Sequence, residues 1–349
     1  MSKSSRIGHE ARPLQRFFLD TGRFSNETGA FSTNLCVSRP ALYQTMHASK
    51  HIAVIGAGTM GHGIAQVAAA ASYPVILYDV ECEALVRGVA AIERNLTQGI
   101  ARGKVTEEMR DRTLQNIRGT TRLEETSESD LFIEAAPEVL ELKRDLLRKV
   151  EALARSAFIF ATNTSSLSIT EIARGARQPQ NVIGMHFFNP VHIMRLVEIV
   201  VGEQTSHETL QAVREVAGRM KKDPITVKDV PGFASSRLGV ALGLEAMRML
   251  EQNVASASDI DTALELGYNH PMGPLRLTDL VGLDVRLRIA EYLHSELKSE
   301  TFRPPEILRR MVSEGKLGKK SGEGFYKWDE KEADAEKKEA RDERQRGSS

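Results

Sequence analysis

The stretch from His51 to Asp79 constrains the fold of this chain more than any other. It joins a short apolar run, a glycine-rich turn, a run of small residues and a second apolar run. Residues 51–55 include β-branched residues and predict a buried strand. The small apolar residues 59–71 predict a helix packed against a sheet, and residues 74–78 predict a second strand that Asp79 closes. This order is typical of the first unit of a doubly wound α/β fold.

The turn in this stretch has the spacing G-x-G-x-x-G and is typical of a dinucleotide site. Gly56 allows the tight turn, Gly58 leaves room for a pyrophosphate, and Gly61 lets the helix approach the strand. Asp79, 18 positions past Gly61, is placed to accept hydrogen bonds from a ribose diol and to repel the extra phosphate of NADP. The sequence therefore predicts NAD as the cofactor, and a glycine-rich turn without a ligand is the alternative. We expect NAD to contact the turn residues Gly56, Gly58, Thr59, Met60 and Gly61.

The composition limits the classes of protein to which the chain can belong. Its 349 residues suffice for two domains with sizeable cores, and 41% of them are hydrophobic, as in soluble globular proteins. Lys+Arg and Asp+Glu both number 47, so no global positive field would recruit nucleic acid or anionic lipid. No apolar run approaches the roughly 18 residues of a membrane span. Cys36 and Cys82 make neither a disulfide framework nor a metal site, and we expect a reducing compartment and no metal.

The two ends of the chain differ from its middle. Residues 1–48 are rich in Ser, Thr, Asn and Arg and lack a helical or strand period, which predicts a disordered extension. Its arginines are typical of a mitochondrial transit peptide, whereas its acidic residues count against one. The alternative is that translation starts at Met46. We expect a cytoplasmic protein, with the mitochondrial matrix as the alternative, and a solvated tail of mixed charge at 329–349.

A long helical stretch is predicted after Asp79, at about residues 81–117, with a break near Gly103. Part of it is basic and contains Arg102. This segment is either an electrostatic seat for a phosphate-bearing tail or a solvated helix face.

Two further strands are predicted at 130–135 and 158–162, and polar residues follow each of them. Glu138 and Lys143 lie at the start of a helix after the first of these strands, close to where a nicotinamide would lie in a doubly wound sheet. Asn163–Ser166 follows the second strand, at the edge where open α/β sheets bind ligands. A plain turn is the alternative for Asn163–Ser166.

The runs 182–191 and 196–201 predict two strands, with a turn signal at Asn189-Pro190 between them. A hairpin centred near residue 192 places His186 opposite Glu198, where their side chains touch. A histidine held by a carboxylate beside a nicotinamide suits hydride transfer, because the imidazole takes the hydroxyl proton as hydride leaves the same carbon. The alternative is that His186 is a core histidine whose hydrogen bond to Glu198 only stabilises the fold.

Six stretches carry a resemblance to a known family: GAGTMGHGIAQ, NTSSLSIT, MHFFNPVHIMRLVEIV, DVPGFASSRL, HPMGPLRLTDLVGLD and KLGKKSGEGFY. They resemble the NAD-dependent L-3-hydroxyacyl-CoA dehydrogenases, especially the bacterial 3-hydroxybutyryl-CoA type, over about residues 50–328. The expected fold class is α/β, with an N-terminal Rossmann-like doubly wound sheet at 49–230 and an all-α C-terminal domain at 231–328. The resemblance implies reversible oxidation of a short-chain L-3-hydroxyacyl-CoA to the 3-oxoacyl-CoA by a homodimer.

The resemblance also implies roles for individual residues. His186 would be the general base, Glu198 its orienting partner, and Ser165 a contact of both substrate and nicotinamide. The other implied contacts are Glu138, Lys143, Asn189 and Lys320 for NAD, and Asn95 and Arg102 for coenzyme A. The family pattern P-G-F-x-x-N-R reads PGFASSR here, so Ser236 replaces an amide that binds the substrate carbonyl. Its hydroxyl is shorter and donates one hydrogen bond, which alters the expected mode of thioester binding.

Two other functions stay open from the sequence. One is a related dehydrogenase that acts on a small hydroxy acid without coenzyme A, and the other is a structural protein with the same fold. The presence of His186, Glu198 and Ser165 together disfavours the structural protein.

Overall fold

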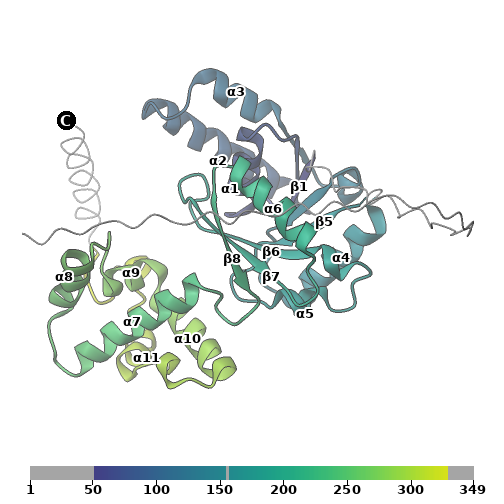
Figure 1. Ribbon diagram of the computed structural model, residues 1–349. Coiled ribbons are helices and arrows are strands. Elements are labelled where there is room, and N and C mark those ends of the chain that lie inside the picture. Colours follow the sequence, from purple (N-terminus) through teal and green to yellow (C-terminus); the bar gives the residue numbers. More distant parts are fainter. Residues whose placement is uncertain (1–50, 155–156, 329–349) are drawn as a thin grey trace, which may run out of the picture. The chain divides into compact units, whose positions relative to one another are not determined.

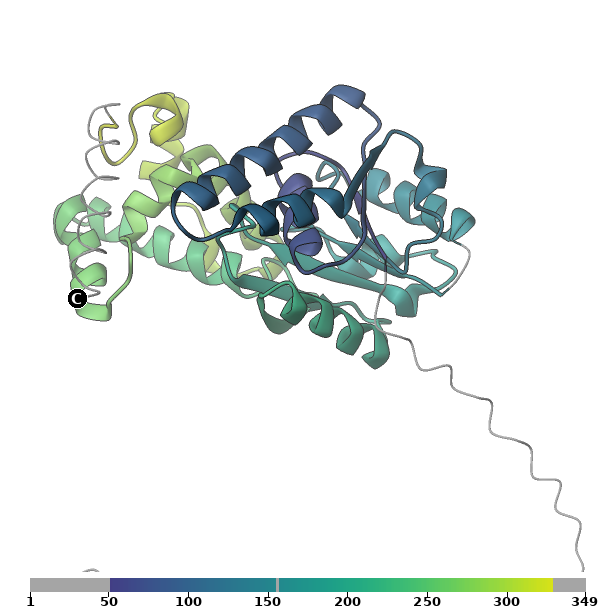
Figure 2. The same cartoon turned by 90° about the horizontal axis from the view of Figure 1, so that it is seen from above.

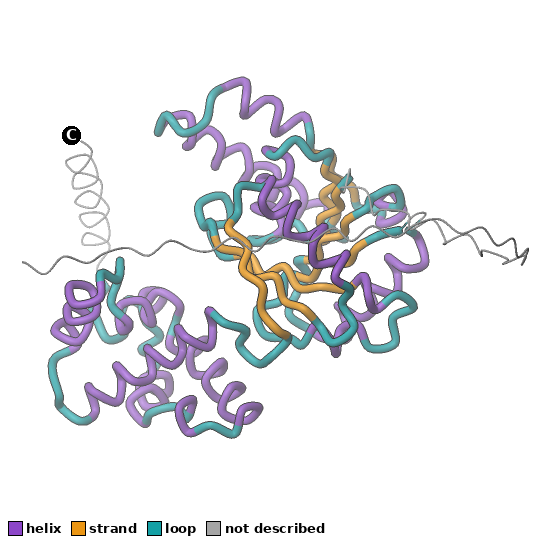
Figure 3. The backbone as a smooth tube through the Cα atoms, in the orientation of Figure 1, coloured by secondary structure: helices purple, strands orange, loops and turns teal. Residues whose placement is uncertain are grey.

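The computed structural model describes residues 51–154 and 157–328, so the predictions for 1–48 and 329–349 lie outside the described residues. The described chain contains an eight-stranded sheet followed by a helical region (Figure 1). All eight strands precede the helix α7, after which the regular elements are helices (Figure 3). The predicted fold class, a doubly wound sheet followed by an all-α part, is confirmed.

The sheet has the strand order β3-β2-β1-β4-β5-β6-β7-β8. Neighbouring strands are parallel except for the antiparallel pair β6 and β7. The direction in which strands are added reverses between β1 and β4, which creates the crevice where such sheets bind ligands. The strands are β1 (Ile52–Ile55), β2 (Val75–Tyr78), β3 (Ile117–Thr120), β4 (Leu131–Glu134), β5 (Ile159–Thr162), β6 (Val182–Phe187), β7 (Leu196–Val201) and β8 (Asp223–Lys228).

Helices cover both faces of the sheet because the central strands are apolar on both faces. One core cluster joins the sheet to α1 (Gly61–Ala70), α2 (Cys82–Ala101) and α6 (His207–Arg219). The other joins it to α4 (Leu140–Leu153) and α5 (Ile169–Ala173). The helix α3 (Glu107–Gln115) packs beside α2, and the two form a helical hairpin (Figure 2).

The helical region has its own buried core, made mainly of aliphatic side chains. Its helices are α7 (Ser235–Glu251), α8 (Ala257–Tyr268), α9 (Pro274–Val281), α10 (Leu283–Leu297) and α11 (Glu306–Ser313). Hydrogen bonds join this region to the sheet region just before α7, where the Ala234 N–H donates to Glu198, and also from within its helices. Ser235 bonds to Glu198, and the Tyr292 hydroxyl donates to the carbonyl of Ser166.

The structure corrects the prediction for residues 81–117 and adds elements that were not predicted. The helix does not continue to Ile117, because α3 ends at Gln115 and Ile117 begins the edge strand β3. The other edge strand, β8, carries Pro224, has no fully buried residue, and lacks the apolar signal of a central strand. The helix α6, between β7 and β8, was not predicted either.

Candidate active site

The glycine turn follows β1 and leads into α1. Gly56 has φ +103°, and a Cβ there would lie 2.7 Å from the carbonyl oxygen of Ala135. A Cβ at Gly61 would overlap the Gly56 carbonyl, so both positions require glycine for packing. A Cβ at Gly58 would meet no protein atom within 4 Å. This open side of the turn, at the entry to α1, fits a pyrophosphate.

Asp79 holds the glycine turn from the end of β2. Its Oδ2 accepts a hydrogen bond from the Ala57 N–H at 2.8 Å, and its Oδ1 accepts one from the Glu81 N–H at 3.0 Å. The carboxylate therefore lies at the predicted place, beside the turn. A carboxylate oxygen has more than one lone pair, so these backbone bonds leave acceptor capacity for a ribose diol.

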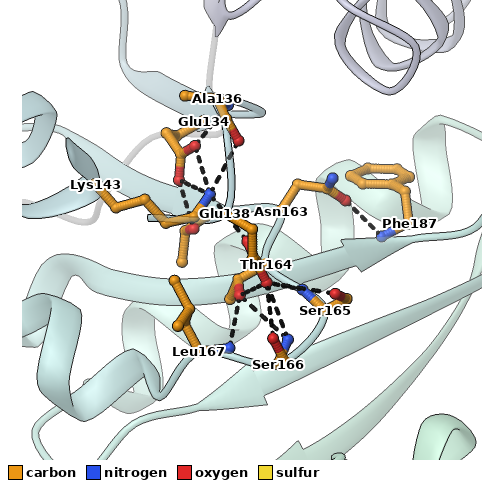
Figure 4. A network of polar contacts seen from close by, with 11 residues as sticks. Glu134, Ala136, Glu138, Lys143, Asn163, Thr164, Ser165, Ser166, Leu167 and Phe187 are labelled. Atoms are coloured by element: carbon orange, nitrogen blue, oxygen red, sulfur yellow. Dashed lines mark hydrogen bonds and ion pairs between the residues drawn. The ribbon is translucent and has the colours of Figure 1, made fainter. Parts of the chain in front are cut away.

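Glu138 organises the polar loop after β5 (Figure 4). Its Oε1 accepts hydrogen bonds from the Thr164 hydroxyl at 2.6 Å, from the Ser165 N–H at 3.0 Å and from the Ser166 hydroxyl at 3.1 Å. Burial raises the pKa of Glu138, but the hydrogen bond from Thr164 and the charge of Lys143 outweigh it and hold the pKa below its ordinary value. The ionised carboxylate therefore fixes the position of Ser165.

Lys143 is completely buried in an ionic network. Its Nζ lies 2.8 and 3.0 Å from the two carboxylate oxygens of Glu134 and 3.4 Å from Oε2 of Glu138 (Figure 4). Thr162 donates a further hydrogen bond to Glu134 at 2.6 Å. In this structure Lys143 supports Glu138, and its contact with NAD stays a prediction.

His186 and Glu198 form the pair that the hairpin predicted. They are direct partners in the register of β6 and β7, and Nδ1 of His186 lies 2.7 Å from Oε2 of Glu198. Both residues are buried. The ring of Phe188 has its centroid 4.5 Å from that of the imidazole, and the centroid of Phe233 lies 5.9 Å away. Because Nδ1 is engaged, Nε2 is the ring nitrogen left for a substrate hydroxyl.

Glu198 accepts three hydrogen bonds besides its contact with His186, and the sequence patterns did not predict them. The Ala234 N–H and the Ser235 N–H donate to Oε1 at 3.1 and 2.8 Å, and the Ser235 hydroxyl donates to Oε2 at 2.8 Å. Burial raises the pKa of Glu198, but the hydrogen bonds from His186 and Ser235 outweigh it and lower the pKa. The carboxylate is therefore ionised and orients the imidazole.

The loop after β5 is tied directly to the strand that carries His186. Asn163 Oδ1 accepts a hydrogen bond from the Phe187 N–H at 2.9 Å (Figure 4). Because β5 and β6 are parallel neighbours, their carboxyl ends lie at the same edge of the sheet as the glycine turn. The structure thus gathers the predicted Ser165, His186 and NAD elements at one edge.

Asn189 lies on the loop after β6 and lines a cavity of about 320 Å³ together with Thr59, Asn95 and Arg102. Asn95 lies on α2, and Arg102 directly follows the last residue of this helix, seven positions further on. A second cavity of about 420 Å³ adjoins the first, since both are lined by Asn95 and Arg102. None of the described residues that line the second cavity is acidic, whereas six are basic: Arg102, Lys104, Arg195, Arg219, Lys221 and Lys222.

Ser236 and Lys320 belong to the helical region. Ser236 is the second residue of α7 and is half-buried, beside the residue that bonds Glu198. Lys320 forms an ion pair with Asp284 near the start of α10. None of the contacts recorded for the described residues joins Lys320 to the glycine turn, so its contact with NAD stays a prediction.

The described chain matches two family models, one after the other. Residues 51–230 match the NAD-binding domain of 3-hydroxyacyl-CoA dehydrogenase, and residues 232–328 match the C-terminal domain of 3-hydroxyacyl-CoA dehydrogenase. The chain belongs to the 3-hydroxyacyl-CoA dehydrogenase family. The resemblance inferred from the six stretches is thereby confirmed, and so is NAD as the cofactor that this family's first domain binds.

Individual 3-hydroxyacyl-CoA dehydrogenases are similar to this chain over nearly their whole length. The chain is 44% identical over 275 residues to the probable 3-hydroxybutyryl-CoA dehydrogenase of Deinococcus radiodurans, which covers 79% of this chain and 99% of the relative. It is 41% identical over 275 residues to the 3-hydroxybutyryl-CoA dehydrogenase of Clostridioides difficile, with 79% and 98% covered. The crystal structure of (S)-3-hydroxybutyryl-CoA dehydrogenase from Ralstonia eutropha superposes with a TM-score of 0.78 at 39% identity and covers 81% of this chain and 100% of that one.

Within 51–154 and 157–328, no group of three or more His, Cys, Asp or Glu side chains is arranged to hold a metal ion. None of the helices in the same ranges has both the length and the apolar content that crossing a membrane requires.

Proposed function

We propose that this chain catalyses the reversible, NAD-dependent oxidation of a short-chain L-3-hydroxyacyl-CoA, such as 3-hydroxybutyryl-CoA, to the 3-oxoacyl-CoA. The observation that carries the proposal is the buried contact of His186 with Glu198 at 2.7 Å, at the sheet edge that also holds the glycine turn. A base supported by an ionised carboxylate suits removal of a hydroxyl proton. If the contact of His186 with Glu198 only stabilised the fold, it would not need to lie at the same sheet edge as a cofactor-binding turn.

The protein's own residues handle the proton. Nε2 of His186 accepts the proton of the 3-hydroxyl, and the charge of Glu198 stabilises the resulting imidazolium. Bound NAD supplies the acceptor for the hydride that leaves the same carbon. The rings of Phe188 and Phe233 flank the imidazole and keep water from it. In the reverse direction the imidazolium returns its proton to the carbonyl oxygen.

Two serines are proposed to contact the substrate. Ser165, held by Glu138, is placed on the loop beside the strand of His186 and is proposed to bind the substrate hydroxyl and to meet the nicotinamide. Ser236 is proposed to donate one hydrogen bond to the thioester carbonyl in place of the family's amide. Glu138, Lys143, Asn189 and Lys320 are proposed to complete the NAD site, directly or by supporting those that touch it.

The two adjoining cavities are proposed to hold coenzyme A. Asn95 and Arg102 line both cavities, and the loop of Asn189 leads to them from the proposed reaction centre. The basic lining without described acids suits the phosphates of coenzyme A. Binding energy from this remote part of the substrate would orient the hydroxyl-bearing carbon for reaction.

The helical region is proposed to form a homodimer. Seven large apolar side chains of α7, α8 and α9 are exposed: Leu238, Leu242, Leu266, Tyr268, Leu277, Leu280 and Val281. Leu266 is 83% exposed and Tyr268 is 78% exposed, which is unusual for side chains of this size unless a partner covers them. A symmetric pair of copies would cover both apolar faces at once.

The proposed reaction takes place in the cytoplasm, or in the mitochondrial matrix if residues 1–48 act as a transit peptide. Mass spectrometry of the N-terminus of the native protein distinguishes these locations, because a transit peptide is removed on import.

The direct test of the function is a substrate panel followed by the absorbance of NADH. We expect acetoacetyl-CoA to be reduced efficiently, with activity that falls as the acyl chain grows, and free acetoacetate and other small oxo acids to be nearly inert. Equal activity with the free acid and its thioester would instead favour a hydroxy-acid dehydrogenase. NADPH serves as the matched control for the cofactor.

A further inference from the structure

The carboxylate of Glu198 is held by four hydrogen bonds from three residues. Oε1 accepts from the backbone N–H groups of Ala234 and Ser235, and Oε2 accepts from the hydroxyl of Ser235. Oε2 is also the atom in contact with Nδ1 of His186. The carboxylate is fully buried, so these bonds replace the water that would otherwise solvate it.

The hydroxyl of Ser235 differs from the other donors. The two backbone N–H groups would be present with almost any residue at 234 and 235, because they belong to the main chain at the start of α7. The hydroxyl depends on the serine itself. It donates to the same oxygen as the histidine, so the two donors share the negative charge of one atom.

The surroundings of Glu198 leave few other groups that could set its charge. On one side β6 presents His186, and on the other side β8 places the apolar Ile225 in register with Glu198. The start of α7 presents Ser235, and the ring centroid of Phe233 lies 5.9 Å from that of the imidazole. Among the described residues, His186 is the titratable group whose charge acts on Glu198.

We propose that Ser235 is a positioning residue of the reaction: its hydroxyl holds Oε2 of Glu198 toward His186 and limits how strongly Glu198 favours a protonated imidazole. This inference rests on the proposed function, because it needs His186 to act as the base. A hydrogen bond to a carboxylate oxygen withdraws negative charge from it. Without the hydroxyl, the carboxylate would stabilise the imidazolium more strongly and hold it less firmly in place.

The position of Ser235 also makes the base depend on both regions of the chain. Glu198 and His186 belong to the sheet, whereas Ser235 is the first residue of the first helix that follows it. The family pattern leaves this position unspecified in P-G-F-x-x-N-R, and here it carries a side chain that reaches the catalytic pair. Ser235 thus adds a side-chain hydrogen bond to the pair at a position that the pattern leaves open.

The test compares Ser235→Ala with wild type in pH profiles of kcat/KM, measured in both directions with 3-hydroxybutyryl-CoA and acetoacetyl-CoA. Oxidation requires the neutral imidazole, so we expect its acidic limb to move to higher pH by about 0.5 to 1 unit. Reduction requires the imidazolium, so we expect its alkaline limb to move the same way. We also expect kcat to fall by about threefold to tenfold while KM for NAD is unchanged.

Two further variants and one control separate this role from a general effect on folding. Ser235→Thr keeps a hydroxyl and is expected to restore both limbs, and Ser235→Cys has a weaker donor and is expected to give an intermediate shift. Ser313→Ala removes an exposed serine hydroxyl of α11 and should behave as wild type. The inference is overturned if the limbs of the pH profiles do not move in Ser235→Ala. It is also overturned if they move as far in Ser235→Thr as in Ser235→Ala. Absence of activity with acetoacetyl-CoA in wild type would instead overturn the proposed function.

Discussion

Glu198 Oε2 lies 2.7 Å from Nδ1 of His186, and the two residues face one another across the antiparallel strands β6 and β7. Both side chains are buried, and burial raises the pKa of Glu198, but the hydrogen bonds from His186 and Ser235 outweigh it and keep the carboxylate ionised. The imidazole is therefore fixed in one orientation, and Nε2 is the nitrogen proposed to exchange a proton with substrate. The expected effects of replacing His186 or Glu198 follow from this contact.

Replacing His186 with Gln removes the proposed base and preserves approximate side-chain size. We expect kcat to fall by about 10² to 10⁴-fold, the range associated with a general base. NADH binding, followed by fluorescence titration, should be almost unchanged, because the glycine turn and Asp79 are intact. Near-normal turnover would exclude His186 as the base.

Glu198→Gln tests the charge of the carboxylate with little change in shape. Without that charge the imidazolium is less favoured, so we expect the acidic limb of the oxidation profile to move to lower pH, opposite in direction to Ser235→Ala. We expect kcat to fall by about tenfold to a hundredfold, because the amide orients the ring less well. A limb that moves to higher pH would contradict the assigned role.

Asp79→Ala removes the carboxylate that bonds Ala57 and Glu81 beside the glycine turn. We expect KM for NAD to rise by about tenfold to a hundredfold, because the charged acceptor for the ribose diol is lost. We expect the preference for NAD over NADP to narrow, because the carboxylate no longer repels the extra phosphate of NADP. Steady-state kinetics with each cofactor measure this ratio. Asp111→Ala, which changes a more exposed acid of α3, is the matched control. An unchanged ratio would refute the ribose assignment.

Glu138 is expected to stabilise the fold at neutral pH and to lose this contribution at acid pH. Its pKa is lowered in the folded state, mainly because the hydrogen bond from Thr164 and the charge of Lys143 outweigh the effect of burial. Its stabilisation is therefore complete above the ordinary glutamate pKa of about 4.3 and is lost as pH falls through the lowered folded value. We expect Glu138→Gln to lower Tm at pH 7 and to melt nearly like wild type well below pH 4. An equal difference in Tm at both pH values would contradict this.

The oligomeric state is expected to depend on the exposed apolar side chains of α7 and α8. Leu266→Asp, combined with Leu238→Asp, should convert a dimer into a monomer, because two charges would be buried in each half of the interface. Light scattering coupled to size-exclusion chromatography measures the mass. Val86→Asp, on the exposed side of α2, adds a charge elsewhere and should leave the mass unchanged. A monomeric wild type would refute the proposed dimer.

Local patterns in the sequence were sufficient for the central part of the site. The glycine spacing between two apolar runs predicted the turn between β1 and α1, and Asp79 followed from the end of the next strand. The pairing of His186 with Glu198 followed from two adjacent strands and the turn between them. Each of these features depends on residues close in sequence, so periodicity and turn chemistry predict them.

Contacts between distant segments were decided by the tertiary structure. The edge strands β3 and β8 carry weak apolar patterns, because solvent replaces a neighbour on their outer side. The burial of Lys143 against Glu134 follows from how α4 packs on β4, and no spacing in the sequence distinguishes it from a solvated lysine. Likewise Ser235 reaches Glu198 across 37 positions.

The sequence by itself thus determined the cofactor turn, the family and the contact of His186 with Glu198, the proposed catalytic pair, since neighbouring residues set strand, turn and register. Only the tertiary structure decided which side chains surround that pair. Those partners come from segments that meet when the helices dock on the sheet, and docking depends on the burial of whole faces and not on the pattern of any one segment.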